Sequence, residues 1–69
     1  MRISARNQLP GSVVSVEHGA VMSIVTIELR GGEHVVASIT QDSAESLGLA
    51  PGDDVLAVVK ATEVMVAKE

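Results

Sequence analysis

The run from Val21 to Leu29 constrains the fold more than any other part of this chain. It is rich in β-branched residues, and Val21, Ser23, Val25, Ile27 and Leu29 alternate with Met22, Ile24, Thr26 and Glu28. A period of two predicts a β-strand. The first half of the run is apolar on both faces, although a strand of a small barrel needs only one buried face. The second apolar face predicts a contact with another subunit.

Four other stretches also have the character of strands, at residues 12–17, 34–39, 55–60 and 63–67. In the first, Val14 and Val16 share one face and mostly polar residues occupy the other, which predicts a half-buried strand after Pro10. The turn Arg30–Glu33 contains two glycines that allow positive φ, so the second and third strands should form a hairpin.

A short helix is expected between the third and fourth strands. Asp42 is followed three residues later by Glu45, which fits an N-cap with its N3 partner, and Gly48 and Pro51 follow where the helix should end. The predicted fold is therefore all-β: a five-stranded OB-like Greek-key barrel with one short helix between the third and fourth strands. A generic antiparallel sandwich is the alternative.

The core that this chain can build is light. Among its 69 residues there is no aromatic side chain and no cysteine, and eight of the hydrophobic residues are Ala. A domain of this length buries only about 60% of the surface that its unfolded chain exposes. The chain has neither a disulfide nor a structural zinc pattern that would add stability to so small a core. Burial of apolar surface between copies of the chain is the remaining common source of stability. We therefore expect a homo-oligomer.

Composition also argues against several partners. The net charge is −4 and base-stacking aromatic residues are absent, so nucleic acid is not an expected partner. No apolar run approaches the length of a membrane span, and the N-terminus lacks the pattern of a secretion signal, so we expect no membrane partner and a cytoplasmic location.

Enzymatic chemistry is not indicated. No Gly-x-Ser-x-Gly elbow is present, and neither His18 nor His34 has a neighbouring nucleophile. The two histidines could meet to hold a metal, but a third ligand is lacking, so we expect no site for a free metal cation. Caps and turns explain the carboxylates without catalysis; these are Asp42, Glu45, Asp53 and Asp54.

Arg6 and Lys60 suggest a binding function instead. Arg6 lies among small polar residues, with Ser4 and Asn7 close by, and Lys60 follows an apolar strand and precedes Ala61. Two cations with hydroxyl and main-chain donors suit a small tetrahedral oxyanion, because each oxygen must regain the hydrogen bonds that it had in water. From spacing alone, solvated surface cations remain the alternative.

Four motifs in order resemble the molbindins, small cytoplasmic molybdate-binding proteins made of a single Mop domain and related to TOBE domains. The similarity covers essentially all of residues 1–69. The motifs are Ser4-Ala5-Arg6-Asn7-Gln8 with Leu9-Pro10-Gly11, Ile39-Thr40-x-x-Ser43 with Leu47-Gly48-Leu49, Pro51-Gly52, and Val59-Lys60-Ala61-Thr62-Glu63-Val64-Met65.

The resemblance implies an OB-like fold, a hexamer built as a trimer of dimers, and molybdate or tungstate bound between subunits. It assigns the oxyanion to Ser4, Ala5, Arg6, Thr40, Lys60 and Ala61. Hydroxyl groups would come from Ser4 and Thr40, and backbone N–H groups from Ala5 and Ala61. Many relatives have Ser in place of Ala61, so one side-chain donor is missing here. A possible second site involves His18 and Gly19.

The function that follows from the resemblance is binding of molybdate or tungstate for storage and homeostasis, without catalysis and without a cofactor. The alternative is an oligomeric OB-like module that serves structure or interaction and binds no anion.

Overall fold

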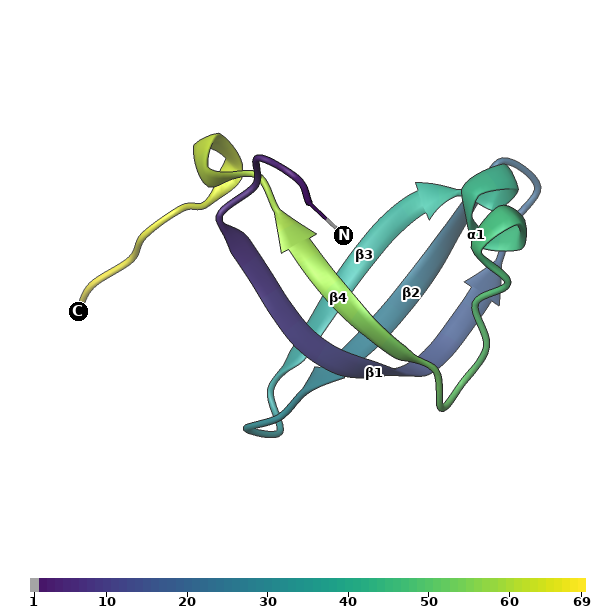
Figure 1. Cartoon of the computed structure of the whole chain (residues 1–69), viewed down its shortest axis with the longest axis horizontal. Helices are drawn as coiled ribbons and strands as arrows, with labels where there is room; N and C mark the ends of the chain where they lie inside the picture. Colours follow the sequence, from purple (N-terminus) through teal and green to yellow (C-terminus); the bar gives the residue numbers. More distant parts are fainter. Residues whose placement is uncertain (1) are drawn as a thin grey trace.

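The computed structural model describes residues 2–69 as one curled antiparallel sheet with a short helix at one end (Figure 1). The elements are β1 (Asn7–His18), β2 (Met22–Leu29), β3 (His34–Thr40), α1 (Gln41–Leu47), β4 (Asp54–Val59) and the 3₁₀ turn η1 (Ala61–Glu63). Within these residues, no helix has the length and apolar character needed to span a membrane.

The sheet has the order β3-β2-β1-β4, and all its neighbours are antiparallel. Three consecutive strands followed by a fourth that returns to lie beside the first is the Greek-key order. The all-β class, the hairpin at Gly31-Gly32 and the helix between the third and fourth strands are thus confirmed. Gly32 has the positive φ of 94° that the hairpin turn requires.

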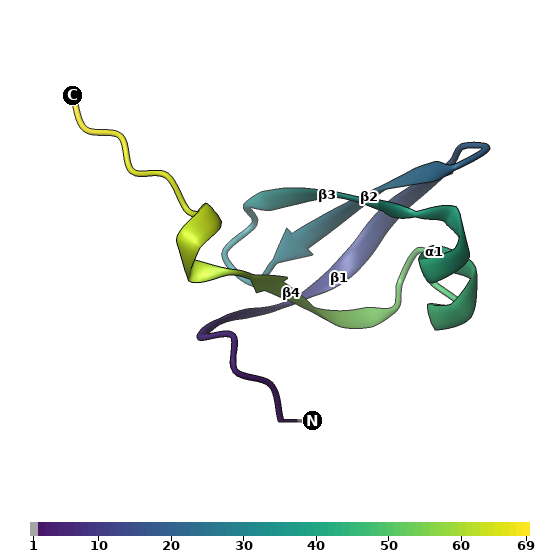
Figure 2. The same cartoon turned by 90° about the horizontal axis from the view of Figure 1, so that it is seen from above.

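One long strand, β1, serves two neighbours. Its first half pairs with β4 and its second half with β2, and only Gly11 and Ser12 pair with both (Figures 1 and 2). We expected this strand to begin at Ser12, after Pro10, which was wrong. Pro10 lies within the half of β1 that has a neighbour on one edge only, and proline is tolerated there because its missing N–H can face the open edge.

A β-bulge in β1 reverses the expected burial of Val14. The register shifts between Val13 and Ser15, so that Val14 is an extra residue in the ladder. Val13 is 3% exposed and Val14 is 44% exposed. The expected shared face was therefore wrong for Val14, whereas Val16 does pack against the core. The reason is that one inserted residue moves the side chains on one side of it to the other face.

The helix α1 begins two residues earlier than expected. Its N-cap is Thr40, whose Oγ1 accepts a hydrogen bond from the Ser43 amide at 3.1 Å, so the prediction of Asp42 as N-cap was wrong. Thr is a strong N-cap residue, and here it also ends β3. The expected stop at Gly48 is confirmed: it adopts φ 63° and its amide donates to the carbonyls of Ala44 and Glu45.

The predicted fifth strand at residues 63–67 is not formed, and the sheet has four strands. Instead, the Glu63 amide donates to the Lys60 carbonyl at 2.9 Å, which makes the η1 turn. This turn directs the following residues away from the sheet edge, as Figures 1 and 2 show. The segment therefore has no neighbouring strand within its own chain. A β-strand forms only where a neighbouring strand shares its backbone hydrogen bonds.

The core is small, as composition predicted. Its buried hydrophobic residues are Val13, Val25, Ile27, Ala44 and Ala57, and the inward face of β2 carries Ser23, Val25 and Ile27. Many larger apolar side chains remain exposed, among them Val21, Met22, Ile24, Val36, Leu47, Met65 and Val66. A contact between copies would remove such side chains from water.

Replacement of Gly11 tests the bend of β1. A Cβ at Gly11 would lie 2.5 Å from the Glu28 carbonyl oxygen and 2.8 Å from Ile27 Cγ2. We therefore expect Gly11→Ala to lower the free energy of unfolding by about 1–3 kcal/mol, measured by urea denaturation at one fixed protein concentration.

The matched control is Gly31→Ala, since a Cβ at Gly31 would meet only the end of the Glu33 side chain, which can rotate away. Equal stabilities of the two variants would contradict the close approach of β1 to β2.

Candidate functional site

The register of β1 against β4 places Arg6 beside Lys60. The outermost pair of the ladder is Asn7 with Val59. Each step inward raises the residue number on β1 by one and lowers the residue number on β4 by one. The next positions outward are therefore Arg6 and Lys60, followed by Ala5 and Ala61. Two cationic residues that are far apart in sequence are thus brought together by an antiparallel ladder.

These residues enclose an open hollow of about 370 Å³ between the N-terminal segment and η1. Its lining contains five of the six residues that sequence analysis assigned to the oxyanion, together with Thr62. The lining residues are Ser4, Ala5, Arg6, Lys60, Ala61 and Thr62. The N-terminal segment is fixed in part by the Gln8 side-chain amide, which donates to the Ala5 carbonyl at 2.8 Å.

The chemistry of the lining is that of an anion site. Arg6 and Lys60 bring positive charge, and Ser4 and Thr62 bring hydroxyl groups. Among the described residues, the backbone amides of Ala61 and Thr62 donate to no other group, since η1 uses only the amides of the residues after them. Charged donors and free amides together suit an oxyanion.

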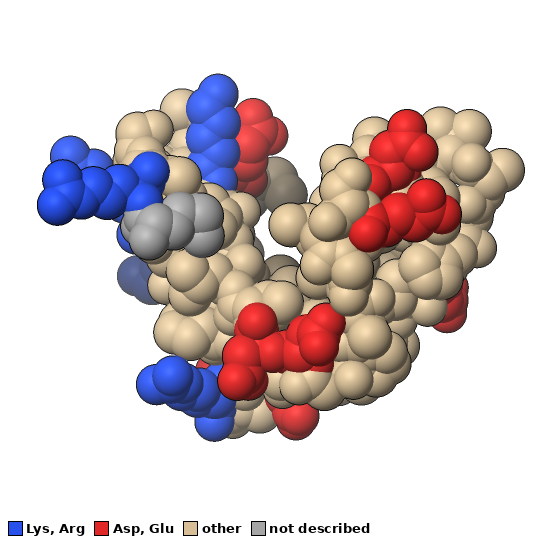
Figure 3. Space-filling model, turned by 45° about the vertical axis from the view of Figure 1, so that its right-hand side comes forward, with Lys and Arg blue, Asp and Glu red and all other residues tan. Residues whose placement is uncertain are grey.

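Charge is distributed unevenly over the molecule. Figure 3 shows Lys and Arg gathered on one side and several Asp and Glu side chains on the other. Arg6 and Lys60 are the charged residues of the lining, with Glu63 following them in η1, whereas Asp42 and Glu45 lie on α1. The lining of the hollow is therefore cationic in a chain whose net charge is −4.

Thr40 does not line this hollow. It pairs with Met22 at the end of β3 and caps α1, with its Oγ1 also 2.8 Å from Ser43 Oγ. Figure 1 shows α1 and η1 at opposite ends of the molecule. Within one chain, Thr40 cannot reach an anion held by Arg6 and Lys60.

His18 and Gly19, the possible second site, lie at the β1–β2 turn near α1. His18 Nδ1 is 2.9 Å from Gln41 Oε1, and the buried Ser23 hydroxyl donates to the same oxygen. Gln41 Nε2 in turn donates to Glu45 at 3.0 Å. These contacts tie the turn to the helix, and the second site stays a prediction.

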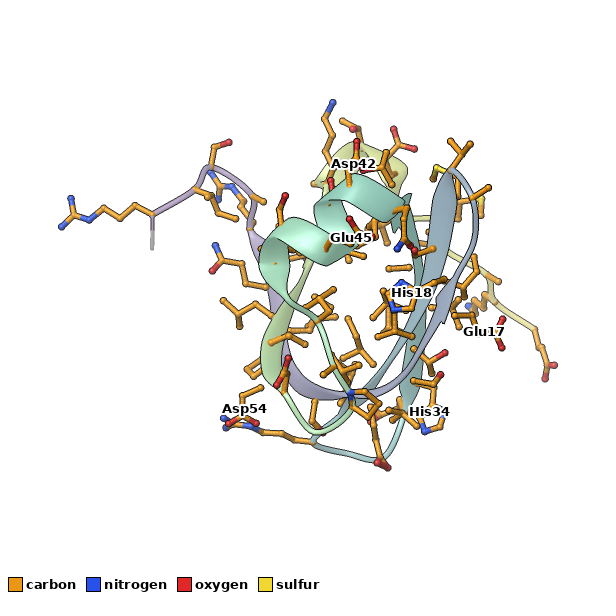
Figure 4. All side chains as sticks on the ribbon, turned by 90° about the vertical axis from the view of Figure 1, so that its right-hand side faces the viewer. Glu17, His18, His34, Asp42, Glu45 and Asp54 are labelled. Atoms are coloured by element: carbon orange, nitrogen blue, oxygen red, sulfur yellow. The ribbon has the colours of Figure 1, made fainter. Side chains whose placement is uncertain are left out.

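The other groups considered from sequence do not form a site together. His18 pairs with Ser23 and His34 with Glu28, far apart along β2, and Figure 4 shows the two histidines well separated. In the described part of the chain, no cluster of three potential metal ligands is found. Asp53 has the turn role expected of it, since its Oδ2 accepts the Ala50 amide at 2.9 Å.

Thr62 is the lining residue that sequence analysis did not assign. Its place in the lining comes from the η1 turn, which begins at Ala61 directly after Lys60. From the sequence we expected only a bend before a fifth strand and so did not assign it.

Known proteins are similar to this chain over nearly its whole length. Residues 3–66 match the family model described as "TOBE domain". The chain is 48% identical over 66 residues to molybdenum-pterin-binding protein 3 of Clostridium pasteurianum, covering 96% of this chain and 97% of that protein.

Two solved structures are similar to the whole fold. A molybdate-binding protein from Sporomusa ovata superimposes with a TM-score of 0.93 at 46% identity, covering 99% of this chain and 100% of that one. The cytoplasmic molybdate-binding protein ModG, with molybdate bound, gives a TM-score of 0.84 at 44% identity, covering 88% of this chain and 43% of that one. The family match and the full-length relative together show that this chain belongs to the TOBE domain family.

Proposed function

We propose that this chain binds molybdate, or the nearly identical tungstate, in the hollow between its N-terminal segment and η1. The observation that carries the proposal is the convergence of Ser4, Arg6 and Lys60 with the free amide of Ala61 at one place. The names of the relatives, which describe binding of molybdate or of a molybdenum–pterin, support the choice of anion.

Binding requires no bond to be made or broken. A tetrahedral dianion leaves water only if charge and hydrogen-bond donors replace its hydration. Arg6 and Lys60 supply charge, Ser4 supplies a hydroxyl, and the amides of Ala5 and Ala61 complete the set that we assign. Thr62 adds a further hydroxyl at the rim. We propose no catalytic residue and no cofactor.

A second copy completes the site. Ser4, Arg6, Lys60 and Ala61 are all exposed in the single chain, where water screens their charge. Thr40 lies at the opposite end of the molecule, so it can contribute only from another subunit. We propose that the hydroxyl of Thr40 of a second copy closes the hollow, in a hexamer arranged as a trimer of dimers.

The proposed role is storage and homeostasis of the oxyanion by a single domain, residues 1–69, in the cytoplasm. The description of ModG as a cytoplasmic molybdate-binding protein supports this location. Since an occupied site between subunits stabilises the assembly by mass action, ligand supply and assembly are coupled. The absence of a nucleic-acid partner stays a prediction.

Removal of either cation tests the assignment. Arg6→Ala and Lys60→Ala should each weaken molybdate binding about tenfold or more, because a hydrogen bond to a charged group contributes about 1.5–3 kcal/mol. Isothermal titration with molybdate, tungstate and sulfate measures the effect, and light scattering checks that the oligomer is kept.

Arg30→Ala is the matched control, since Arg30 lies in the β2–β3 turn and outside the hollow. Unchanged affinity in both test variants would refute the site. If the unaltered protein shows no heat with any of the three anions, the alternative of an interaction module without anion binding is favoured.

Ala61→Ser should strengthen binding. The substitution adds a hydroxyl donor beside the Ala61 amide, and one more hydrogen bond to the anion is worth about a fewfold gain in affinity or more. Titration of Ala67→Ser, which adds the same hydroxyl to the tail far from the hollow, should show no gain. An Ala61→Ser affinity equal to that of the unaltered protein would indicate that the side chain at this position faces away from the anion.

A further inference from the structure

Ser23 is the one buried polar side chain in the described residues 2–69. It is 0% exposed on the inward face of β2, which it shares with Val25 and Ile27. Burial of a hydroxyl lowers stability unless a partner replaces the hydrogen bonds that the group makes with water. A valine would suit both the strand and the core at this position. The serine therefore indicates a polar contact that the fold uses.

Gln41, the first residue of α1, provides that contact. The Ser23 hydroxyl donates to Gln41 Oε1, and His18 Nδ1 lies 2.9 Å from the same oxygen. Gln41 Nε2 donates to Glu45 at 3.0 Å, so the oxygen of the amide is the atom that faces β2. This pairing assigns the proton of the His18 imidazole to Nδ1. The carboxamide of Gln41 is thus bound on both of its polar atoms.

The backbone of Gln41 is held at the same place. Its amide donates to the Val21 carbonyl at 2.8 Å, so both the main chain and the side chain of this residue bind the β1–β2 hairpin. Figure 4 shows His18 beside α1, the helix that carries Glu45. A helix of seven residues has little stability of its own in water. The position of α1 therefore depends on such contacts with the sheet.

Thr40 is the residue whose position these contacts determine. It directly precedes Gln41 and is exposed, and our proposed function places its hydroxyl against the anion of a second copy. Adjacent residues share one rigid peptide plane, so a fixed Gln41 also fixes the backbone of Thr40. A hydroxyl contributes to binding only when it lies at the distance and angle of a hydrogen bond.

We propose that Ser23 and Gln41 are positioning residues of the anion site. They act without touching the anion, by fixing the start of α1 so that Thr40 presents its hydroxyl to molybdate bound by another copy. This inference rests on the proposed function and deepens it. A contact inside one chain governs the affinity of a site whose cations belong to a second chain.

Removal of the buried hydroxyl tests the inference. Ser23→Ala should lower the affinity for molybdate about threefold or more, because Gln41 loses one of the contacts that hold it. The matched control is Ser38→Ala, since Ser38 is an exposed serine of β3. Isothermal titration of the full-length proteins measures both affinities, and light scattering checks that the oligomer is kept. Equal affinities of the two variants would overturn the inference.

A double variant separates positioning from stability. Gln41→Ala leaves the buried Ser23 hydroxyl without its partner, so this variant should unfold at a lower urea concentration. Ser23→Ala/Gln41→Ala should recover much of that loss, because both members of the polar pair are then absent. The affinity for molybdate should stay low, since the contact is missing from both variants. Affinity that recovers together with stability would show a general effect on folding and would overturn the positioning role.

Mixed oligomers show on which chain Ser23 acts. Ser23→Ala should impair the contribution of Thr40 only, so a chain with this change still supplies an intact Lys60. After co-refolding of Ser23→Ala with Lys60→Ala, about a quarter of the sites should therefore recover native affinity. The control mixture contains Ser23→Ala and Thr40→Asp, which removes the hydroxyl but keeps an N-cap. It should show no recovery, because every chain then has an impaired Thr40.

The mixtures also separate this inference from the proposed function. Absence of recovery with Lys60→Ala, or recovery with Thr40→Asp, would overturn the positioning role while the unaltered protein still binds molybdate. An unaltered protein that binds no molybdate would instead refute the proposed function, and this inference with it.

Discussion

The antiparallel pairing of β1 with β4 is the interaction on which the rest of the structure depends. It joins the two ends of the chain, with Asn7 opposite Val59, and so creates the hollow between Arg6 and Lys60. β1 can also pair with β2 only because it bends at Gly11, where a larger residue would collide with the backbone of β2. The local geometry of one glycine thus permits both the curled sheet and the site.

The single chain leaves its proposed site incomplete in a way that a second copy would correct. The donors of the hollow are exposed to water, and Thr40 lies at the far end of the molecule. In our proposal a second copy supplies the Thr40 hydroxyl to the site, so binding of the anion and assembly of the copies depend on each other.

Local patterns predicted most of the fold, and the exceptions have physical reasons. The alternation in β2 predicted a strand, and Gly48 identified the helix end. The bulge at Val14 was missed because an inserted residue leaves no mark in a period of two. The prediction of a fifth strand was wrong within one chain. High β-propensity at residues 63–67 does not specify which strand would pair with this segment.

The candidate site was predictable in composition but not in arrangement. Charge and small polar residues pointed to Arg6 and Lys60, and resemblance to a family identified the anion. The role of Thr40 as a helix cap and the position of Thr62 in the lining depend on register and on the start of α1, which the sequence pattern placed at Asp42.

The most direct test of the central claim, a site shared by two copies, is complementation between inactive subunits. Lys60→Ala removes a cation, and Thr40→Asp keeps an N-cap while placing a negative charge where the hydroxyl would meet the anion. Neither protein alone should bind molybdate tightly. After co-refolding, about a quarter of the sites should recover native affinity, because random mixing pairs an intact Lys60 with an intact Thr40 of another chain. No recovery in the mixture would contradict a site formed between subunits.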